Sequence, residues 1–385
     1  MLTHTLSLPV DAAETWFGEL PASPAVFVLR GAGEPYVSKT ANLRRRLQRW
    51  LGSPAEHSKR LNLRNRVHEI EYSLTGSEFE SQFLLYRALR EIFPKTYAKR
   101  LRLRPAPLVK LHLENEFPRA SVTTRFSTRG SNLYYGPFQS RATAEKFASD
   151  ALDFFKMRRC VDDLHPDPSF PGCIYSEMKM CLAPCFKGCT DEEYRAEVSR
   201  VQAFFDTSGE SLTRELMDER ERASGELAFE DAAALHTRLE KLKPVLAQLP
   251  EIVRRIDRLQ AFVVQPSAEP GCVSLFRFSE AGMAGPIALN LDLHAHPESM
   301  ESRVQKTLAD FPASPANSTV ERTEHLAILK RWYYRSHRQG EIFFPDDKGW
   351  WPLRRLVRGI GRVYRGEQEQ TAHTFSATDV IPPPS

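Results

Sequence analysis

The sequence predicts an α+β protein built from several domains. Its 385 residues, 41% of them hydrophobic and 26% charged, have the composition of a globular chain long enough for about two to four domains. Short β-type runs and longer amphipathic helical runs occupy different parts of the chain. Five of the six cysteines fall between Cys160 and Cys189, in a stretch with little regular pattern. We therefore expect ordered domains on both sides of a cysteine-rich segment.

Positive charge is concentrated in two short segments. The formal net charge is only +4, but basic residues are bunched within residues 43–66 and 99–104, and such local density predicts a polyanionic partner. No apolar stretch approaches the roughly 20 residues that span a bilayer, and no basic segment followed by an apolar run opens the chain. These observations predict a cytoplasmic protein without membrane contact.

The N-terminal part predicts an arm, residues 1–20, followed by a small α/β domain, residues 21–105. The elements expected in this domain are a strand at 25–29, a turn at 31–34, a second strand at 35–37 and a basic helix that begins near Asn42. A further helix is predicted at 78–92. Pro94 stops it, and Phe83, Leu84 and Leu89 suit its packed face.

Residues 106–195 predict a cysteine-rich region with little core of its own. Short strand-like runs and a break at Gly136-Pro137 precede an amphipathic stretch at 142–157, and the cysteines follow. Metal ligation would supply the stability that this region lacks.

Residues 196–255 predict a helical hairpin. Its helices span about 210–226 and 229–243, and Pro244 closes the second. Two apolar stripes mark facing surfaces, the first formed by Leu212, Leu216, Ala223 and Leu227 and the second by Ala232, Leu235, Leu239 and Leu242.

Residues 256–366 predict a C-terminal α+β domain, and residues 367–385 a disordered polar tail. The domain begins with β-type alternation at 261–264 and 272–278, followed by an arginine-rich helix near 324–338. The aromatic residues interleaved with its arginines predict a core-facing stripe with a basic outer face; they are Trp332, Tyr333, Tyr334, Trp350 and Trp351.

The cysteine spacing is the most specific signal in the chain. Cys160, Cys173, Cys181 and Cys185 follow the pattern C-x12-C-x7-C-x3-C, with Cys189 after another three residues. In a reducing compartment such a group predicts a metal site rather than disulfides, and four thiolates suit either zinc or an iron–sulfur cluster. The alternative, unrelated buried thiols, fits Cys272 in its strand but not cysteines that lie among prolines and glycines.

The same segment resembles the central region of the UvrC excinuclease family. The resemblance lies in Tyr134-Tyr135-Gly136-Pro137-Phe138, then Cys160, then Cys173, then Cys181-Leu-Ala-Pro-Cys185, in that order and spacing. It implies a [4Fe–4S] cluster on Cys160, Cys173, Cys181 and Cys185, with Cys189 a spare; zinc remains the alternative.

The helical hairpin is similar to the interaction (UVR) motif of that family, which docks on a matching hairpin of UvrB, the damage-loading protein of the excinuclease. The resemblance lies in residues 227–235, Leu-Ala-Phe-Glu-Asp-Ala-Ala-Ala-Leu. The partner-binding residues that it implies are Leu227, Phe229, Ala232, Ala233, Leu235 and Leu239. Taken alone, the pattern equally fits an ordinary internal hairpin.

The N-terminal domain resembles the GIY-YIG nuclease domain with which the family begins, with Ala25-Val26-Phe27 and Tyr36-Val37-Ser38 at the two triplets. The catalytic residues implied are Tyr36, Lys39 and Arg46. The metal-binding glutamate of the family aligns with Leu85, which cannot hold Mg²⁺ or Mn²⁺; a different alignment would leave Glu78, Glu80 or Glu91. The basic helix can still grip DNA phosphates through Arg44, Arg45 and Arg49.

The resemblance covers about residues 21–245 and implies a shortened member, since the remaining residues are too few for the second nuclease of ribonuclease-H type and the helix-hairpin-helix units. We expect a DNA-binding accessory of nucleotide excision repair that engages UvrB and does not cut. The alternatives are an active endonuclease that makes a single incision with Mg²⁺ or Mn²⁺, and a redox or metal sensor for which DNA is incidental.

Overall fold

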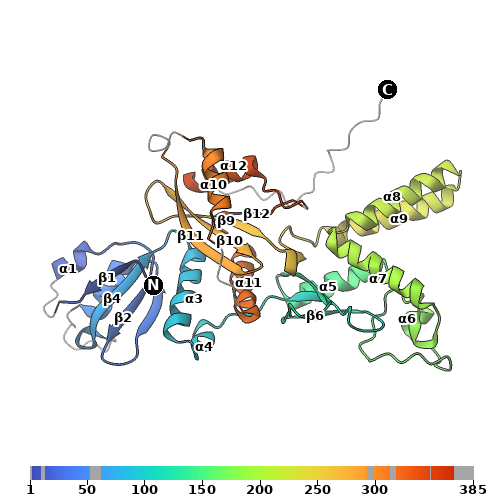
Figure 1. Ribbon diagram of the computed structural model, residues 1–385, viewed down its shortest axis with the longest axis horizontal. Helices are drawn as coiled ribbons and strands as arrows, with labels where there is room; N and C mark the ends of the chain where they lie inside the picture. Colours follow the sequence, from blue (N-terminus) through green and yellow to red (C-terminus); the bar gives the residue numbers. More distant parts are fainter. Residues whose placement is uncertain are drawn as a thin grey trace. The chain divides into compact units, whose positions relative to one another are not determined.

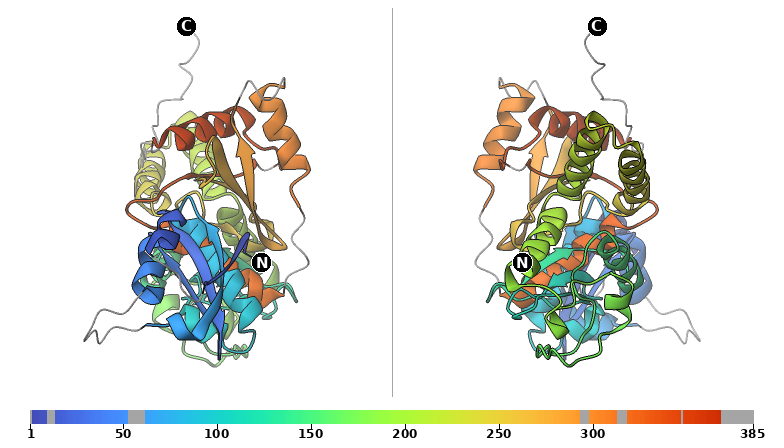
Figure 2. Two further views of the ribbon diagram at one scale, coloured as in Figure 1. Left: turned by 90° about the vertical axis from the view of Figure 1, so that its left-hand side faces the viewer. Right: turned by 90° about the vertical axis from the view of Figure 1, so that its right-hand side faces the viewer.

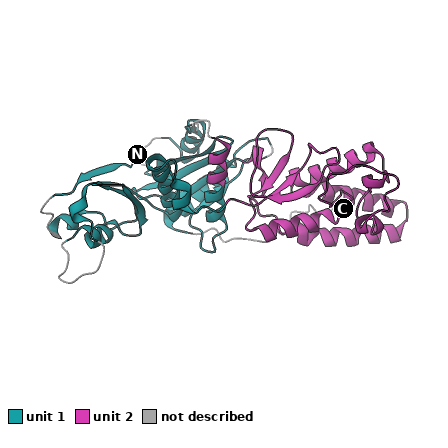
Figure 3. Ribbon diagram, turned by 90° about the horizontal axis from the view of Figure 1, so that it is seen from below, with its two compact units in different colours: residues 1–104, 260–317, 327–370 teal, residues 105–259, 318–326, 371–385 magenta. Residues whose placement is uncertain are grey.

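The computed structural model describes residues 2–9, 14–52, 62–292, 298–312, 318–346 and 348–367. The chain forms two compact units (Figure 3). The first contains the described residues within 1–104, 260–317 and 327–370, and the second contains those within 105–259 and 318–326. The predicted tail, 367–385, lies outside the described residues apart from Glu367.

The N-terminal part of the first unit is a four-stranded antiparallel sheet in the order β1-β4-β2-β3 (Figure 1). Its elements are β1 (His4–Ser7), α1 (Glu14–Glu19), β2 (Ala25–Gly31), β3 (Tyr36–Thr40), α2 (Leu43–Leu51), β4 (Val67–Leu74), α3 (Glu78–Ile92) and α4 (Tyr97–Leu101). The predicted hairpin and both predicted helices are confirmed. The expected separation of residues 1–20 as an arm is wrong, because β1 pairs with β4 from His4 opposite Tyr72 to Ser7 opposite Glu69.

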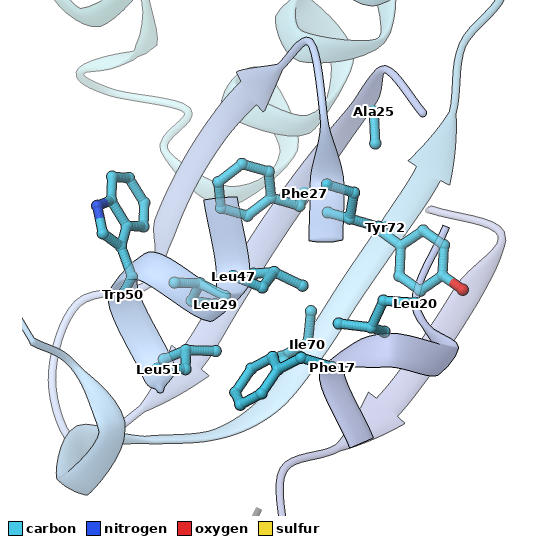
Figure 4. Packing of buried hydrophobic residues seen from close by; sticks show 11 residues of the cluster. Phe17, Leu20, Ala25, Phe27, Leu29, Leu47, Trp50, Leu51, Ile70 and Tyr72 are labelled. Carbon is cyan, nitrogen blue, oxygen red and sulfur yellow. The ribbon is translucent and has the colours of Figure 1, made fainter. Parts of the chain in front are cut away.

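The core of this sheet follows from strand alternation. Ala25, Phe27 and Leu29 of β2 point to one face, where Leu43, Leu47 and Leu51 of α2 pack against them (Figure 4). Helix α2 begins at Asn42, whose side chain accepts the backbone N–H of Arg45. Helix α3 lies on the opposite face of β2 and β3.

The C-terminal part of the first unit is a second antiparallel sheet, in the order β11-β10-β9-β12. Its elements are β9 (Ala261–Pro266), β10 (Cys272–Ser279), β11 (Gly282–Asn290), α10 (Met300–Ala309), α11 (Thr319–Tyr333), β12 (Glu341–Phe343) and α12 (Leu353–Arg365). Helices α10 and α12 lie beside each other (Figure 2) and share one core with the sheet. The predicted arginine-rich helix starts earlier than expected, since the Ser318 hydroxyl accepts the N–H of Glu321 and caps it.

Helix α3 also packs against this second sheet. Phe79 and Phe83 contact Phe276 of β10 with ring centroids 5.0 and 5.9 Å apart, and Phe79 lies 5.2 Å from Trp332. Glu80 is buried between α3 and the second sheet. Its carboxylate accepts hydrogen bonds from the backbone N–H of Gly76 at 2.8 Å and from the hydroxyl of Ser274 at 3.4 Å. The aromatic face of α3 therefore buries a carboxyl group.

The second unit contains a sheet in the order β6-β5-β7-β8 and five helices among its described residues. Its elements are β5 (Leu108–Leu111), β6 (Ala120–Thr123), β7 (Leu133–Gly136), α5 (Arg141–Leu152), α6 (Ile174–Glu177), α7 (Asp191–Asp206), α8 (Glu210–Gly225), α9 (Phe229–Leu246) and β8 (Arg254–Arg255). The first residues of α11 are grouped with this unit. Among the described residues, no helix is both long and apolar enough to cross a membrane.

The expectation that residues 106–195 have little core is wrong for their first half. Phe147 of α5 packs against Phe138, Phe204 and Phe205, and Tyr135 packs against Phe205. Phe204 and Phe205 belong to α7, a helix that was not predicted from the sequence. Its N-terminus carries a capping box, with Thr190 accepting from Glu193 and Glu193 accepting from Thr190, which is the signal that predicts such a helix.

Helices α8 and α9 form the predicted hairpin (Figure 1). Leu212, Leu216 and Leu242 are buried. Pro244 does not close α9, which continues to Leu246. The proline lies in the last turn, where its missing N–H removes one hydrogen bond and leaves the helix otherwise complete.

The buried carboxyl group of Glu80 gives the first unit a pH-dependent stability. Burial raises the pKa of Glu80 to about 7, above the roughly 4.3 of an unfolded glutamate. Since the folded state keeps a proton that the unfolded state releases, stability is fully present below about pH 4 and falls until about pH 7, by up to about 3 kcal/mol. Denaturant unfolding followed by tryptophan fluorescence measures this unit, because all five tryptophans belong to it.

The matched variants are Glu80→Gln, which keeps the shape without the charge, and the exposed Glu280→Gln. We expect Glu80→Gln to flatten the fall between about pH 5 and pH 8 and Glu280→Gln to leave it unchanged. A wild-type protein whose stability rises over this interval by the same amount as both variants would contradict the prediction.

Candidate functional site

Four of the six cysteines surround one cavity in the second unit. Cys160, Cys173, Cys181 and Cys185 line it together with Arg158, Arg159 and Tyr175, while Cys189 does not. The remaining cysteine, Cys272, lies in β10 of the first unit. The structure thus brings together the four positions that the resemblance implies.

Short local structures hold each thiol in place. Cys173 is the N-cap residue of α6, and its backbone N–H donates to the Ser176 hydroxyl at 2.9 Å. Cys181 accepts the backbone N–H of Ala183 at 3.3 Å, and Cys185 follows Pro184 in a single 3₁₀ turn. Few of these residues are fully buried, so backbone turns rather than a hydrophobic core shape the segment.

Burial raises the pKa of the Cys181 thiol to about 11, and the nearby thiols of Cys160, Cys185 and Cys173 raise it further. Burial also raises the pKa of Cys185. The mutual influence shows that the four sulfurs are close enough to sense each other's charge. A group that binds thiolates must therefore displace protons here.

Four thiols around one cavity are the donor set of either a zinc ion or an iron–sulfur cluster. A structural zinc ion needs its sulfurs within about 2.3 Å of one point, and no three His, Cys, Asp or Glu side chains in the described part of the chain converge in this way. The thiols instead surround a cavity. In a [4Fe–4S] cluster each cysteine binds a different iron, so its sulfurs stand around the group rather than meeting at a point.

The three residues expected for catalysis lie on two faces of the N-terminal sheet. Tyr36 lies on the α2 face, edge-on to Trp50 with ring centroids 5.0 Å apart, and the Arg46 guanidinium lies 5.0 Å above the same indole. Figure 4 shows Trp50 beside Phe27 on this face. Lys39, three residues along β3, points to the other face.

On the α3 face, Lys39 binds the carboxylate of Glu78 and donates to the Gln82 side-chain oxygen at 3.2 Å. Leu85, one turn further along the same side of α3, is half-buried and adds no ligand. Of the alternative glutamates, Glu80 is buried against Ser274 and Glu91 is exposed, so only Glu78 accompanies a predicted catalytic residue.

Arg335 was not identified from the sequence as a site residue. Its guanidinium lies 3.6 Å from Glu78, and Arg331 and Trp332 line a small hollow with Glu78 and Gln82. Nothing in the local sequence predicts this contact, because it joins residues 257 positions apart, Glu78 and Arg335.

The arginines of the basic helix α2 differ in exposure and in hydrogen bonding. Arg45 and Arg49 are exposed and lie four residues apart on one side of the helix. Arg44 donates to the carbonyl of Leu20 at 2.7 Å and so ties the helix to the residue after α1. Of the three arginines expected to grip phosphates, Arg45 and Arg49 therefore present open surface to a polyanion.

The predicted partner-binding residues also fall into two groups, one exposed and one half-buried. Leu227 and Phe229, at the turn of the hairpin, are 71% and 66% exposed, and Ala233 is exposed as well. Ala232, Leu235 and Leu239 are half-buried between the helices. The apolar surface that the hairpin offers is at its tip.

These features define a chain in which four cysteines of an otherwise turn-rich segment line one cavity. Residues 107–204, which contain all four cavity-lining cysteines, match the family described as UvrC/Cho excinuclease, middle domain. This match agrees with the resemblance to the UvrC family that the motifs in this segment predict.

Several curated relatives are named UvrABC system protein C. That of Rickettsia africae (strain ESF-5) is 27% identical over 304 residues, which are 78% of this chain and 43% of the relative. That of Rickettsia bellii (strain RML369-C) is 26% identical over 328 residues, 84% of this chain and 47% of the relative. The chain thus spans less than half the length of these relatives. No solved structure matches it significantly.

Proposed function

We propose that this chain is a DNA-binding protein of nucleotide excision repair that engages UvrB and does not itself cut DNA. The observation that carries the proposal is that the segment matching the excinuclease middle domain holds its four cysteines around a single cavity. A cytoplasmic location follows from the same role, because it keeps these cysteines reduced and gives access to DNA.

The proposed cofactor is a [4Fe–4S] cluster held by Cys160, Cys173, Cys181 and Cys185. It would cross-link a segment built from turns and supply one-electron chemistry. Support comes from the shared cavity and from the exclusion of Cys189.

The absence of cutting rests on the composition of α3. Phosphodiester cleavage in this fold needs a metal that stabilises charge on the phosphate, and that metal needs a carboxylate. Leu85 has none, and Tyr36 and Lys39 lie on opposite faces of the sheet.

One contact favours the alternative of an active endonuclease that uses Mg²⁺ or Mn²⁺. Glu78 places a carboxylate beside Lys39 and Gln82, on the same side of α3 as Leu85. A metal there would have to displace Lys39 and Arg335 from Glu78.

The cofactor proposal predicts that only four of the six cysteines are needed to retain iron. After anaerobic purification we expect about four irons per chain and broad visible absorbance, retained in Cys189→Ser and Cys272→Ser and lost in Cys160→Ser, Cys173→Ser, Cys181→Ser and Cys185→Ser. Metal analysis and absorbance spectra measure this. One zinc per chain, or equal iron loss in Cys189→Ser and Cys181→Ser, would contradict the proposed [4Fe–4S] cluster.

The non-cutting role predicts no strand scission of a lesion-bearing duplex loaded with damage-recognition proteins, in Mg²⁺ or in Mn²⁺. Denaturing gels of end-labelled strands report scission. Incision by the wild type that disappears in both Glu78→Gln and Tyr36→Phe would establish the endonuclease instead.

The control for this assay is DNA binding, which separates a non-cutting protein from one that never reaches the duplex. Arg45→Gln with Arg49→Gln should weaken binding and lower the slope of log affinity against log salt by about 2, while the exposed Arg195→Gln on α7 leaves both unchanged. Fluorescence anisotropy between about 50 and 200 mM salt gives the slope.

The proposed contact between the hairpin and UvrB can be tested separately, through a loss of binding affinity. Leu227→Asp with Phe229→Asp should weaken binding to UvrB at least tenfold, because charge replaces the exposed apolar tip. Met217→Asp, at an exposed position on α8, is the matched control, and calorimetry measures both. Equal affinities for the two variants would place the contact elsewhere.

A further inference from the structure

Two arginines line the cysteine cavity from the same stretch of chain. Arg158 is 2% exposed, and its Nη1 donates to the Cys160 Sγ at 3.3 Å and to the Asp162 carbonyl at 2.8 Å. Its Nε donates to the Phe117 carbonyl at 2.8 Å. Carbonyl dipoles and one cysteine sulfur thus surround a buried cation.

A buried guanidinium needs a negative partner. Arginine stays protonated at any physiological pH, and burying a charge is costly unless an opposite charge accompanies it. The acceptors that contact the Arg158 side chain are carbonyl oxygens and the Cys160 sulfur, with no carboxylate among these described contacts. A thiolate, or a group bound to thiolates, supplies the missing charge.

Arg159, at the next position, has a carboxylate partner but also a hydrogen-bond donor without an acceptor. It also lines the cavity, and its Nη2 binds Asp153 at 2.8 Å. Its Nε is buried and has no hydrogen-bond partner among the described residues. Buried N–H groups are rarely left without an acceptor, so this donor is available to a group in the cavity.

We propose that Arg158 and Arg159 are positioning residues that neutralise the thiolate-bound cluster and raise its reduction potential. The inference rests on the proposed cofactor. Four thiolates leave an oxidised cluster with a net charge of about −2. The two guanidinium groups offset part of this charge, with Arg159 shared between the cluster and Asp153. The Arg158 N–H donates to the Cys160 sulfur, and hydrogen bonds and charge at the sulfurs are the means by which proteins set such potentials.

The sign of the effect follows from charge. One-electron reduction adds a further negative charge to the cluster, and a fixed cation beside it stabilises the reduced form more than the oxidised form. Loss of one guanidinium therefore makes the cluster harder to reduce. A merely structural arginine, which ties together the backbone of residues 117 and 162, would change folding stability and leave the potential unchanged.

The test is a redox titration of anaerobically purified protein with a chemical reductant, followed by electron paramagnetic resonance. The variants are Arg158→Gln, Arg158→Lys and Arg159→Gln, with the exposed Arg195→Gln as control. We expect Arg158→Gln and Arg159→Gln each to shift the reduction equilibrium about tenfold toward the oxidised form, about 59 mV for one electron. Arg158→Lys, which keeps the charge, should shift less, and Arg195→Gln should not shift.

The outcomes distinguish the cofactor from the role of the two arginines. A wild type without iron would overturn the proposed cofactor and this inference with it. A wild type with a cluster, and unchanged potentials in Arg158→Gln and Arg159→Gln, would overturn the inference alone. If Arg158→Gln loses both its circular dichroism signal and its iron, that variant has not folded. The reduction potential of Arg159→Gln then tests the proposed role. The Arg159 guanidinium binds the exposed Asp153 rather than the backbone of Phe117 or Asp162, so an unchanged potential there refutes the role.

Discussion

The first unit depends on helix α3 being buried from two sides. One side covers β2 and β3, and the other packs Phe79 and Phe83 against Phe276 of the C-terminal sheet. A helix enclosed in this way has little room for polar groups. Of its carboxylates near these contacts, Glu78 is paired with Lys39, and burial pushes Glu80 toward the protonated form. The same enclosure explains why a leucine suits position 85, since a half-buried carboxylate without a metal would cost stability there.

The second unit meets the opposite constraint. Its aromatic core, built on α5 and α7, stops before the cysteine segment, which is held by caps and single turns. The proposed cluster would give such a segment, through ligation, the order that apolar burial does not supply. Arg158 joins the two regions, because its backbone N–H donates to the hydroxyl of Tyr194 on α7 while its side chain reaches Cys160. The charge at the cysteines and the position of α7 are therefore linked through one residue.

The sequence was sufficient where the signals are local. Asn42 and Pro94 predicted where two helices begin and end, and the strand predicted at 25–29 is present. Cysteine spacing predicted a group of clustered thiols, and the family resemblance predicted which four of them share a cavity. The sequence was insufficient where distant residues meet. The pairing of β1 with β4, the contact of Arg335 with Glu78 and the burial of Glu80 by Ser274 join segments far apart in the chain, and no local pattern encodes them. The helix α7 was missed although its capping box is local.

In the proposed role, DNA binding persists without cutting because the groups that serve each activity lie on separate faces of the N-terminal domain. The exposed Arg45 and Arg49 lie on α2, and the aromatic pair Tyr36 and Trp50 packs on that side of the sheet. The carboxylate and lysine that a metal would need lie with α3 on the other side. Phosphate contacts depend on charge and exposure and need no particular geometry at α3. If Leu85 stands at the metal-ligand position, as the resemblance implies, it removes the chemistry of one face and leaves the electrostatic attraction of the other intact.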